Sequence, residues 1–106
     1  MRAELQNIVD KITKSLKLLE QRMDLGSVNH RLEEFNALSE NPSFWKNQKN
    51  AQTLMRERQF LVNQIETYEN LSSELKDNVD LVELAEQESE VEILEEIEEN
   101  LKKLLI

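Results

Sequence analysis

The fold is decided by residues 47–79, which read NQKNAQTLMRERQFLVNQIETYENLSSELKDNV. The side chains of one stripe recur in this stretch at steps of three or four residues, apart from the neighbouring pairs at 54–55 and 61–62. They are Ala51, Leu54, Met55, Arg58, Leu61, Val62, Ile65, Tyr68, Leu71, Leu75 and Val79. This period is that of an amphipathic α-helix. Because no Gly or Pro interrupts the stripe, we predict one long helix over about 47–78, with Asn47 as its N-cap. A helix of about thirty residues is about 45 Å long, which predicts an elongated molecule.

Two shorter helices are predicted before this long helix, over about 3–23 and 28–39. The first carries an apolar stripe of Leu5, Ile8, Val9, Ile12, Leu16, Leu19 and Met23, and the second one of Val28, Leu32, Phe35 and Leu38. Gly26 is the single glycine, and we expect it to end the first helix in the left-handed conformation. Ser27 is then expected to cap the second helix.

Asn41-Pro42 breaks the second helix, because the residue before proline is disfavoured in the helical region. Phe44 and Trp45 follow at once. Two large aromatic rings in a corner between helices are expected to close the bend as a hydrophobic plug. Pro42, Phe44 and Trp45 are therefore predicted to form a structural aromatic corner.

Beyond the long helix, Asp80 with Glu83 and Ser89 with Glu92 both have the spacing of a capping box, which predicts helix restarts near 80 and near 89. The last helix is expected to turn Val91, Leu94, Ile97, Leu101 and Leu104 inward and glutamates outward. The sequence stops at Leu104-Leu105-Ile106, inside this stripe. We expect the natural chain to continue, and an isolated stripe of this kind could also pair two copies.

Composition agrees with helices throughout. The chain has 106 residues, of which 39% are hydrophobic, with one Gly and one Pro. A strand-rich fold would need more turn residues than these. We predict a single all-α domain over 1–106: an elongated antiparallel helical bundle or helical hairpin with coiled-coil-like packing. The breaks at Gly26, Pro42 and near Asp80 favour folding back within the chain over a continuous coiled coil with a partner.

Charge divides the chain. The net charge is −9 overall, +2 for residues 1–58 and −11 for residues 59–106. Four basic residues near the aromatic pair, Lys46, Lys49, Arg56 and Arg58, are the candidates for contact with RNA. The same residues could instead simply keep a helix surface solvated. The acidic helix around Glu92–Glu99 should face solvent or a basic protein surface.

The sequence offers little for catalysis or cofactor binding. It has no Cys, and its single histidine, His30, is expected to be an exposed helix residue. We expect no catalytic, cofactor-binding or metal-binding residues: one glycine cannot build a phosphate cradle, and no calcium loop is present. The absence of a long apolar run or a secretory signal predicts a cytoplasmic protein without a membrane partner.

Several short motifs resemble the N-terminal region of bacterial class I peptide chain release factors, in particular of the members that read UGA and UAA. The matching residues are Arg31-Leu32-Glu33-Glu34, Asn36-Ala37, Asn41-Pro42-Ser43-Phe44-Trp45, Ala51-Gln52, Glu57-Arg58, Leu61, Leu75, Asp77, Leu81 and Glu83-Leu84-Ala85. The resemblance covers the whole chain. Its most specific element is Pro42 and Trp45 with Ala51-Gln52 six residues beyond.

The resemblance implies a helical domain that positions a termination factor on the ribosome near the stalk base, beside rRNA and ribosomal protein, with no DNA partner. In this family a Ser-Pro-Phe tripeptide reads the stop codon and a Gly-Gly-Gln loop promotes peptidyl-tRNA hydrolysis. Neither tripeptide occurs in this sequence, so we expect neither activity here, and the remaining domains of the factor become partners. The alternatives are a free-standing coiled-coil adaptor or chaperone-like bundle, and a small carboxylate metalloenzyme.

Overall fold

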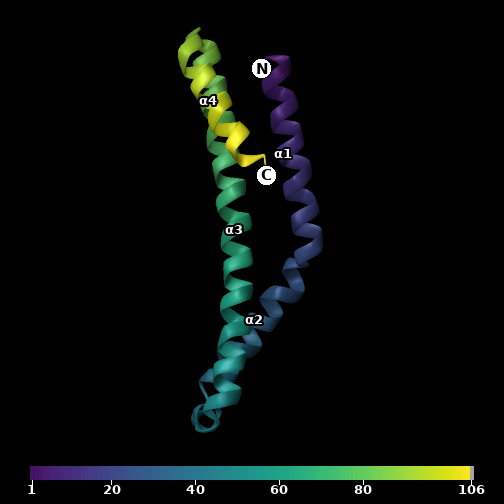
Figure 1. The fold of residues 1–106 in the computed structure, drawn as a ribbon, viewed down its shortest axis with the longest axis vertical. Coiled ribbons are helices and arrows are strands. Elements are labelled where there is room, and N and C mark those ends of the chain that lie inside the picture. The colour runs from purple at the N-terminus through teal and green to yellow at the C-terminus, as the bar shows by residue number, and fades with distance from the viewer. Residues whose placement is uncertain (106) are drawn as a thin grey trace. The chain divides into compact units, whose positions relative to one another are not determined.

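The computed structural model describes residues 1–105, and these contain helices and turns but no strand (Figure 1). The elements are α1 (Ala3–Met23), α2 (Leu25–Ser39), the short 3-10 helix η1 (Pro42–Lys46), α3 (Gln48–Gln87) and α4 (Val91–Leu104). The all-α prediction is confirmed. By its internal contacts the chain divides into a terminal unit, Met1–Leu19 with the chain from Tyr68 on, and a central unit, Glu20–Thr67.

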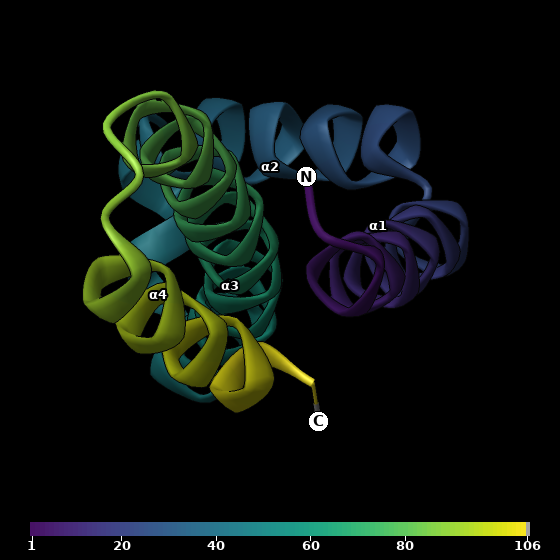
Figure 2. The ribbon, with the colours of Figure 1, turned by 90° about the horizontal axis from the view of Figure 1, so that it is seen from above.

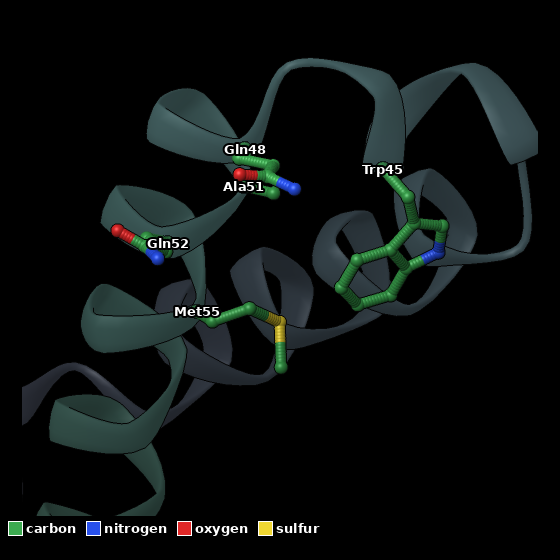
Figure 3. Close-up of a pocket in the computed structure, with 5 residues that line it drawn as sticks. All are labelled: Trp45, Gln48, Ala51, Gln52 and Met55. Carbon is green, nitrogen blue, oxygen red and sulfur yellow. The ribbon is translucent and has the colours of Figure 1, made fainter.

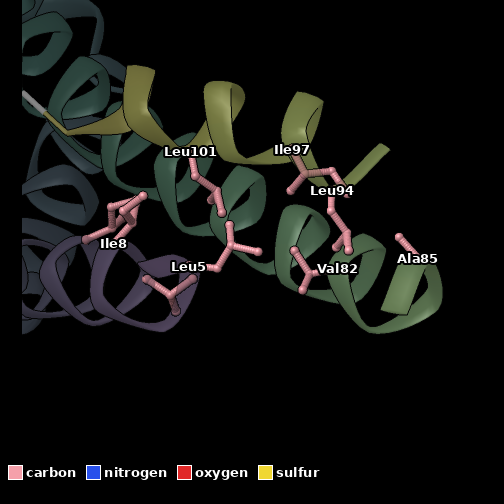
Figure 4. Packing of buried hydrophobic residues seen from close by; sticks show 9 residues of the cluster. Leu5, Ile8, Val82, Ala85, Leu94, Ile97 and Leu101 are labelled. Atoms are coloured by element: carbon pink, nitrogen blue, oxygen red, sulfur yellow. The ribbon is translucent and has the colours of Figure 1, made fainter. Parts of the chain in front are cut away.

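The core of the terminal unit joins three helices. Its buried residues are Leu5, Ile8, Val9 and Ile12 of α1, Val82 and Ala85 of α3, and Leu94, Ile97 and Leu101 of α4 (Figure 4). Each of the Leu, Ile and Val side chains contributes roughly 1.5–3 kcal/mol when it is fully buried. The apolar stripes predicted for the first and last helices are therefore confirmed, except that Val91 is exposed.

Within this unit, α4 returns alongside the C-terminal part of α3, as both views of the ribbon show (Figures 1 and 2). Near the beginning of α1, the Met1 ammonium lies 3.2 Å from the Glu86 carboxylate, close to the end of α3. The contact between the beginning of α1 and the end of α3 agrees with antiparallel packing. Ile106, the last residue of the apolar C-terminal stretch, lies outside the described residues.

The turn between α3 and α4 is a Schellman motif built without glycine. Ser89 is left-handed, with φ 53°. The Glu90 N–H donates to the Ala85 carbonyl at 2.9 Å, and the Ser89 N–H donates to the Glu86 carbonyl at 3.2 Å. These two bonds satisfy carbonyls that the end of a helix leaves without a partner.

Of the two restarts predicted after the long helix, the one near 80 was wrong, whereas the one near 89 is confirmed in position, because α4 begins at Val91, but not in its cap. Asp80 lies inside α3, which continues to Gln87 because Val79 and Val82 extend its apolar stripe into the core. An acidic residue three positions before a glutamate is also an ordinary surface pattern within a helix. Ser89 ends α3 rather than capping α4, whose N-cap is Glu90 without a side-chain bond.

The central unit contains α2, η1 and the first part of α3. Its buried side chains are Met23, Val28, Phe35, Phe44 and Ala51. The Asn47 side chain accepts a hydrogen bond from the Asn50 N–H at 3.1 Å, which confirms Asn47 as the cap before α3. Leu38, expected on the inner face of the second helix, is exposed instead.

Asp24, not Gly26, makes the turn between α1 and α2. Asp24 is left-handed, with φ 50°, and among the described residues no glycine has positive φ. Its carboxylate accepts hydrogen bonds from the Ser27 N–H at 3.4 Å and the Ser27 hydroxyl at 2.9 Å. Aspartate tolerates this conformation because its short side chain can bond locally. Helix α2 therefore begins at Leu25, and Ser27 donates to the cap rather than supplying it.

This assignment can be tested by two substitutions. Asp24→Ala should lower the free energy of unfolding by about 1–2 kcal/mol, because the cap is lost and alanine is strained in the left-handed region. Gly26→Ala should raise it by up to about 1 kcal/mol, since a Cβ there meets only the Asp24 Oδ1 at 3.8 Å. Urea unfolding followed by circular dichroism measures both. Destabilisation by Gly26→Ala would show that the turn requires glycine.

Candidate nucleic-acid interface

The corner between α2 and α3 is built by Asn41 and Pro42. Asn41 is extended, with φ −84° and ψ 121°, as expected before proline. Its side-chain oxygen accepts hydrogen bonds from the Ser43 N–H at 3.0 Å and the Ser43 hydroxyl at 2.9 Å. Pro42 opens η1, where its missing N–H leaves no helix bond unmade. The predicted helix break is confirmed at this position.

The two aromatic rings of the corner have different environments. Phe44 is 9% exposed, whereas Trp45 is 51% exposed. The rings meet edge to face, with centroids 4.9 Å apart and planes at 89°. The plug prediction is thus right for Phe44 and wrong for Trp45. In a 3-10 helix consecutive side chains point about 120° apart, so burial of Phe44 directs its neighbour elsewhere.

Trp45 is nevertheless held in place. Its indole N–H donates to the Ser39 carbonyl at 3.0 Å. That carbonyl belongs to the last residue of α2, where helix carbonyls have no partner within the helix. Together with the edge contact from Phe44, this bond fixes the ring while much of its surface stays open to solvent.

Beside the indole lies a hollow of about 400 Å³ on the first turns of α3 (Figure 3). Its lining residues are Trp45, Gln48, Ala51, Gln52 and Met55. Gln48, Gln52 and Met55 are spaced by four and three residues, so they share one face of the helix. This hollow was not predicted from the sequence, although the helical spacing of Gln48, Gln52 and Met55 beside Trp45 indicates that these residues share a face.

The four basic candidates do not form one cluster. Lys46, Lys49 and Arg56 are exposed, whereas Arg58 is half-buried. Lys49 and Arg56 lie seven residues apart, hence within about 20° of each other around α3, and flank Gln52 by helical spacing. Arg58 lies about 160° away from Arg56. Among residues 1–105, no hydrogen bond or ion pair engages any of these four side chains.

Arg31 shows the contrasting arrangement. Its guanidinium donates to both oxygens of Glu57, at 3.2 Å each, and to Glu34 at 2.8 Å. It also lies over the Phe35 ring, 4.5 Å from the centroid. The hydrogen bonds that Arg31 donates to Glu57 and then to Glu34 hold the pKa of Arg31 above its usual value. This arginine ties α2 to α3, and its charge is already matched.

His30 and the glutamates of α4 lie at the surface. The exposed His30 ring lies 3.3 Å from the Glu34 carboxylate, one helical turn along α2. On α4, Glu92, Glu95, Glu96 and Glu99 are exposed and Glu98 is half-buried, as expected. Within the described part of the chain, no group of three His, Asp or Glu side chains is placed to hold a metal ion. No helix in that part is long and apolar enough to cross a membrane.

Comparison with known proteins gives consistent matches. Residues 28–105 match the family model of the PCRF domain. Over 104 residues, 98% of this chain, the sequence is 45% identical to peptide chain release factor 2 of Roseobacter denitrificans and 48% identical to that of Ruegeria sp.. The chain spans 28% of the length of each of these two relatives. No solved structure matches this chain.

The different roles of the two rings predict different stabilities. Phe44→Ala should lower the free energy of unfolding by about 3 kcal/mol or more, as expected for a buried ring. Trp45→Phe keeps a ring but loses the bond to Ser39, so it should lower stability by about 1 kcal/mol. Thermal and urea melts measure both. Equal losses for the two variants would contradict the assignment of the plug to Phe44 alone.

Proposed function

Because this chain belongs to the PCRF domain family, we propose that it is the N-terminal helical domain of a bacterial release factor that ends translation at UGA and UAA codons. The main support for this proposal is the match to peptide chain release factor 2 over 98% of this chain. Since the chain spans 28% of those relatives, the release activity itself belongs to a longer protein. The match favours this role over that of a free-standing adaptor.

The proposed task of the domain is positioning. It docks the factor on the ribosome near the stalk base, against rRNA and ribosomal protein, while the remaining domains of the factor decode and promote hydrolysis. Two observations support this division of labour. The sequence lacks Ser-Pro-Phe and Gly-Gly-Gln. Among residues 1–105 no polar or charged side chain is buried, whereas catalytic groups are commonly tuned by burial.

The RNA-facing side of the domain is proposed to be the surface that carries Lys46, Lys49 and Arg56. These side chains are exposed and have no acidic partner among the described residues, so their charge is available to phosphates. Arg58 lies on another side of α3 and would make a separate contact. The exposed glutamates of α4 suit a basic protein surface rather than RNA.

Charge reversal tests the RNA-facing side. Lys49→Glu with Arg56→Glu should weaken cosedimentation with ribosomes and reduce the slope of log affinity against log salt by about 1–2, because up to two phosphate contacts are lost. Lys14→Glu with Lys17→Glu is the matched control, since both lysines are exposed on α1 and the charge change is equal. Equal weakening by both double variants would contradict a local contact.

A release assay tests the division of labour. Added to ribosomes that carry peptidyl-tRNA and a UGA codon, this chain should release no peptide, because it lacks both tripeptides of the family. The full-length release factor 2 of Ruegeria sp. serves as the positive control. Codon-dependent release by the 106-residue chain alone would overturn the proposal that this domain only positions the factor.

A further inference from the structure

We propose that Trp45 is a stacking platform for an unpaired RNA base, with the Gln48 amide near the edge of that base and Lys46, Lys49 and Arg56 near the flanking phosphates. This inference deepens the proposed function and rests on it. It names the chemistry of the RNA that the corner would take, namely a single-stranded or looped nucleotide whose base is free to leave its stack.

The state of the indole supports stacking rather than hydrogen bonding. Its N–H is already bonded to the Ser39 carbonyl, so the exposed part of the ring offers π surface without a free donor. Phe44 packs against the ring in an edge-to-face pair, with centroids 4.9 Å apart. A ring that is oriented before binding loses little conformational freedom on contact. Proteins that bind single-stranded RNA present aromatic rings of this kind to bases.

The hollow beside the ring supplies room and polar groups. It measures about 400 Å³, toward the small end of the range for ligand pockets, which suits a single small ring system. Trp45, Ala51 and Met55 give it apolar walls, and Gln48 and Gln52 complete its lining. The Gln48 amide, which can both donate and accept, points toward the indole, whereas the Gln52 amide points away from it (Figure 3). An amide beside an aromatic ring is suited to the edge of a base, whose donors and acceptors alternate.

The charges around the hollow favour a polyanion over a peptide. Residues 41–56 contain Lys46, Lys49 and Arg56 and no acidic residue. Beyond this stretch, Glu57 is held by Arg31, whereas Glu40 is an exposed residue at the end of α2 that makes its cap bond through the backbone N–H. Lys49 and Arg56 flank Gln52 on α3 by helical spacing. A base in the hollow would therefore have cationic side chains on one flank, where the sugar-phosphate backbone can run.

The first test uses the chain itself, because Trp45 is its only tryptophan. Single-stranded hexa-adenylate RNA, titrated at low salt, should quench the Trp45 fluorescence to saturation. An abasic hexamer of the same charge should bind about tenfold more weakly and quench little, with a similar salt dependence. Equal affinity for the two oligonucleotides, or no quenching by hexa-adenylate, would overturn the stacking proposal.

Variants separate stacking from the structural bond to Ser39. Binding of fluorescein-labelled hexa-adenylate should stay within about threefold for Trp45→Phe, which keeps a ring, and fall about tenfold or more for Trp45→Leu. Phe60→Leu, at a 61% exposed aromatic residue elsewhere on α3, is the control and should change nothing. Circular dichroism checks that each variant folds. Binding that follows thermal stability instead of the presence of a ring would overturn the proposal.

Ribosome cosedimentation distinguishes the two levels of inference. If the wild-type chain binds ribosomes but hexa-adenylate leaves Trp45 fluorescence unchanged, stacking is wrong and the proposed function stands. If the chain does not bind ribosomes while hexa-adenylate quenches Trp45, the docking role is wrong and the stacking site stands. Loss of ribosome binding in Trp45→Leu, with retention in Trp45→Phe, is the result expected when both are right.

Discussion

Ending a helix without glycine is the constraint on which this structure depends. With one glycine and one proline in 106 residues, the chain turns at residues with a side chain that accept an unusual backbone conformation. Asp24 and Ser89 do so with positive φ, and Asn41 does so by turning extended before Pro42. In each case local hydrogen bonds satisfy groups that the helix end would leave unpaired. The positions of these turns decide which apolar stripes pack against one another.

The helices were predicted correctly from the period of their apolar residues. The errors concerned helix ends that were predicted from single residues. The stripes of the first and last helices were identified because burial on one face imposes a period of 3.6 residues. Gly26 and Asp80 misled because a glycine or an acidic residue fits several helix positions equally well. At the candidate site, the basic residues were chosen from the charge pattern and stay a prediction. The burial of Phe44 rather than Trp45 depends on the geometry of η1, which the apolar character of the two residues does not reveal.

Arginine has two distinct uses in the central unit. Arg31 is surrounded by Glu34, Glu57 and the Phe35 ring, so its charge serves packing between α2 and α3. Arg56 has no such partner in the described part of the chain and keeps its charge free. Neither use follows from counting charges over half of the sequence. The two arginines differ because the corner at Asn41 places Glu57 of α3 beside Arg31 of α2.

The core of the terminal unit also sets an order of folding. Ile12 and Val82, both buried in it, are 70 residues apart in the sequence, whereas Ala85 and Leu94 are separated by one short turn. Contacts between near neighbours form sooner, because closing a long loop loses more chain entropy. During synthesis, α1 is made first and obtains its partners last. Its apolar face therefore stays unpaired until α3 and α4 have been made. Aggregation or capture by a chaperone is most favourable during this interval.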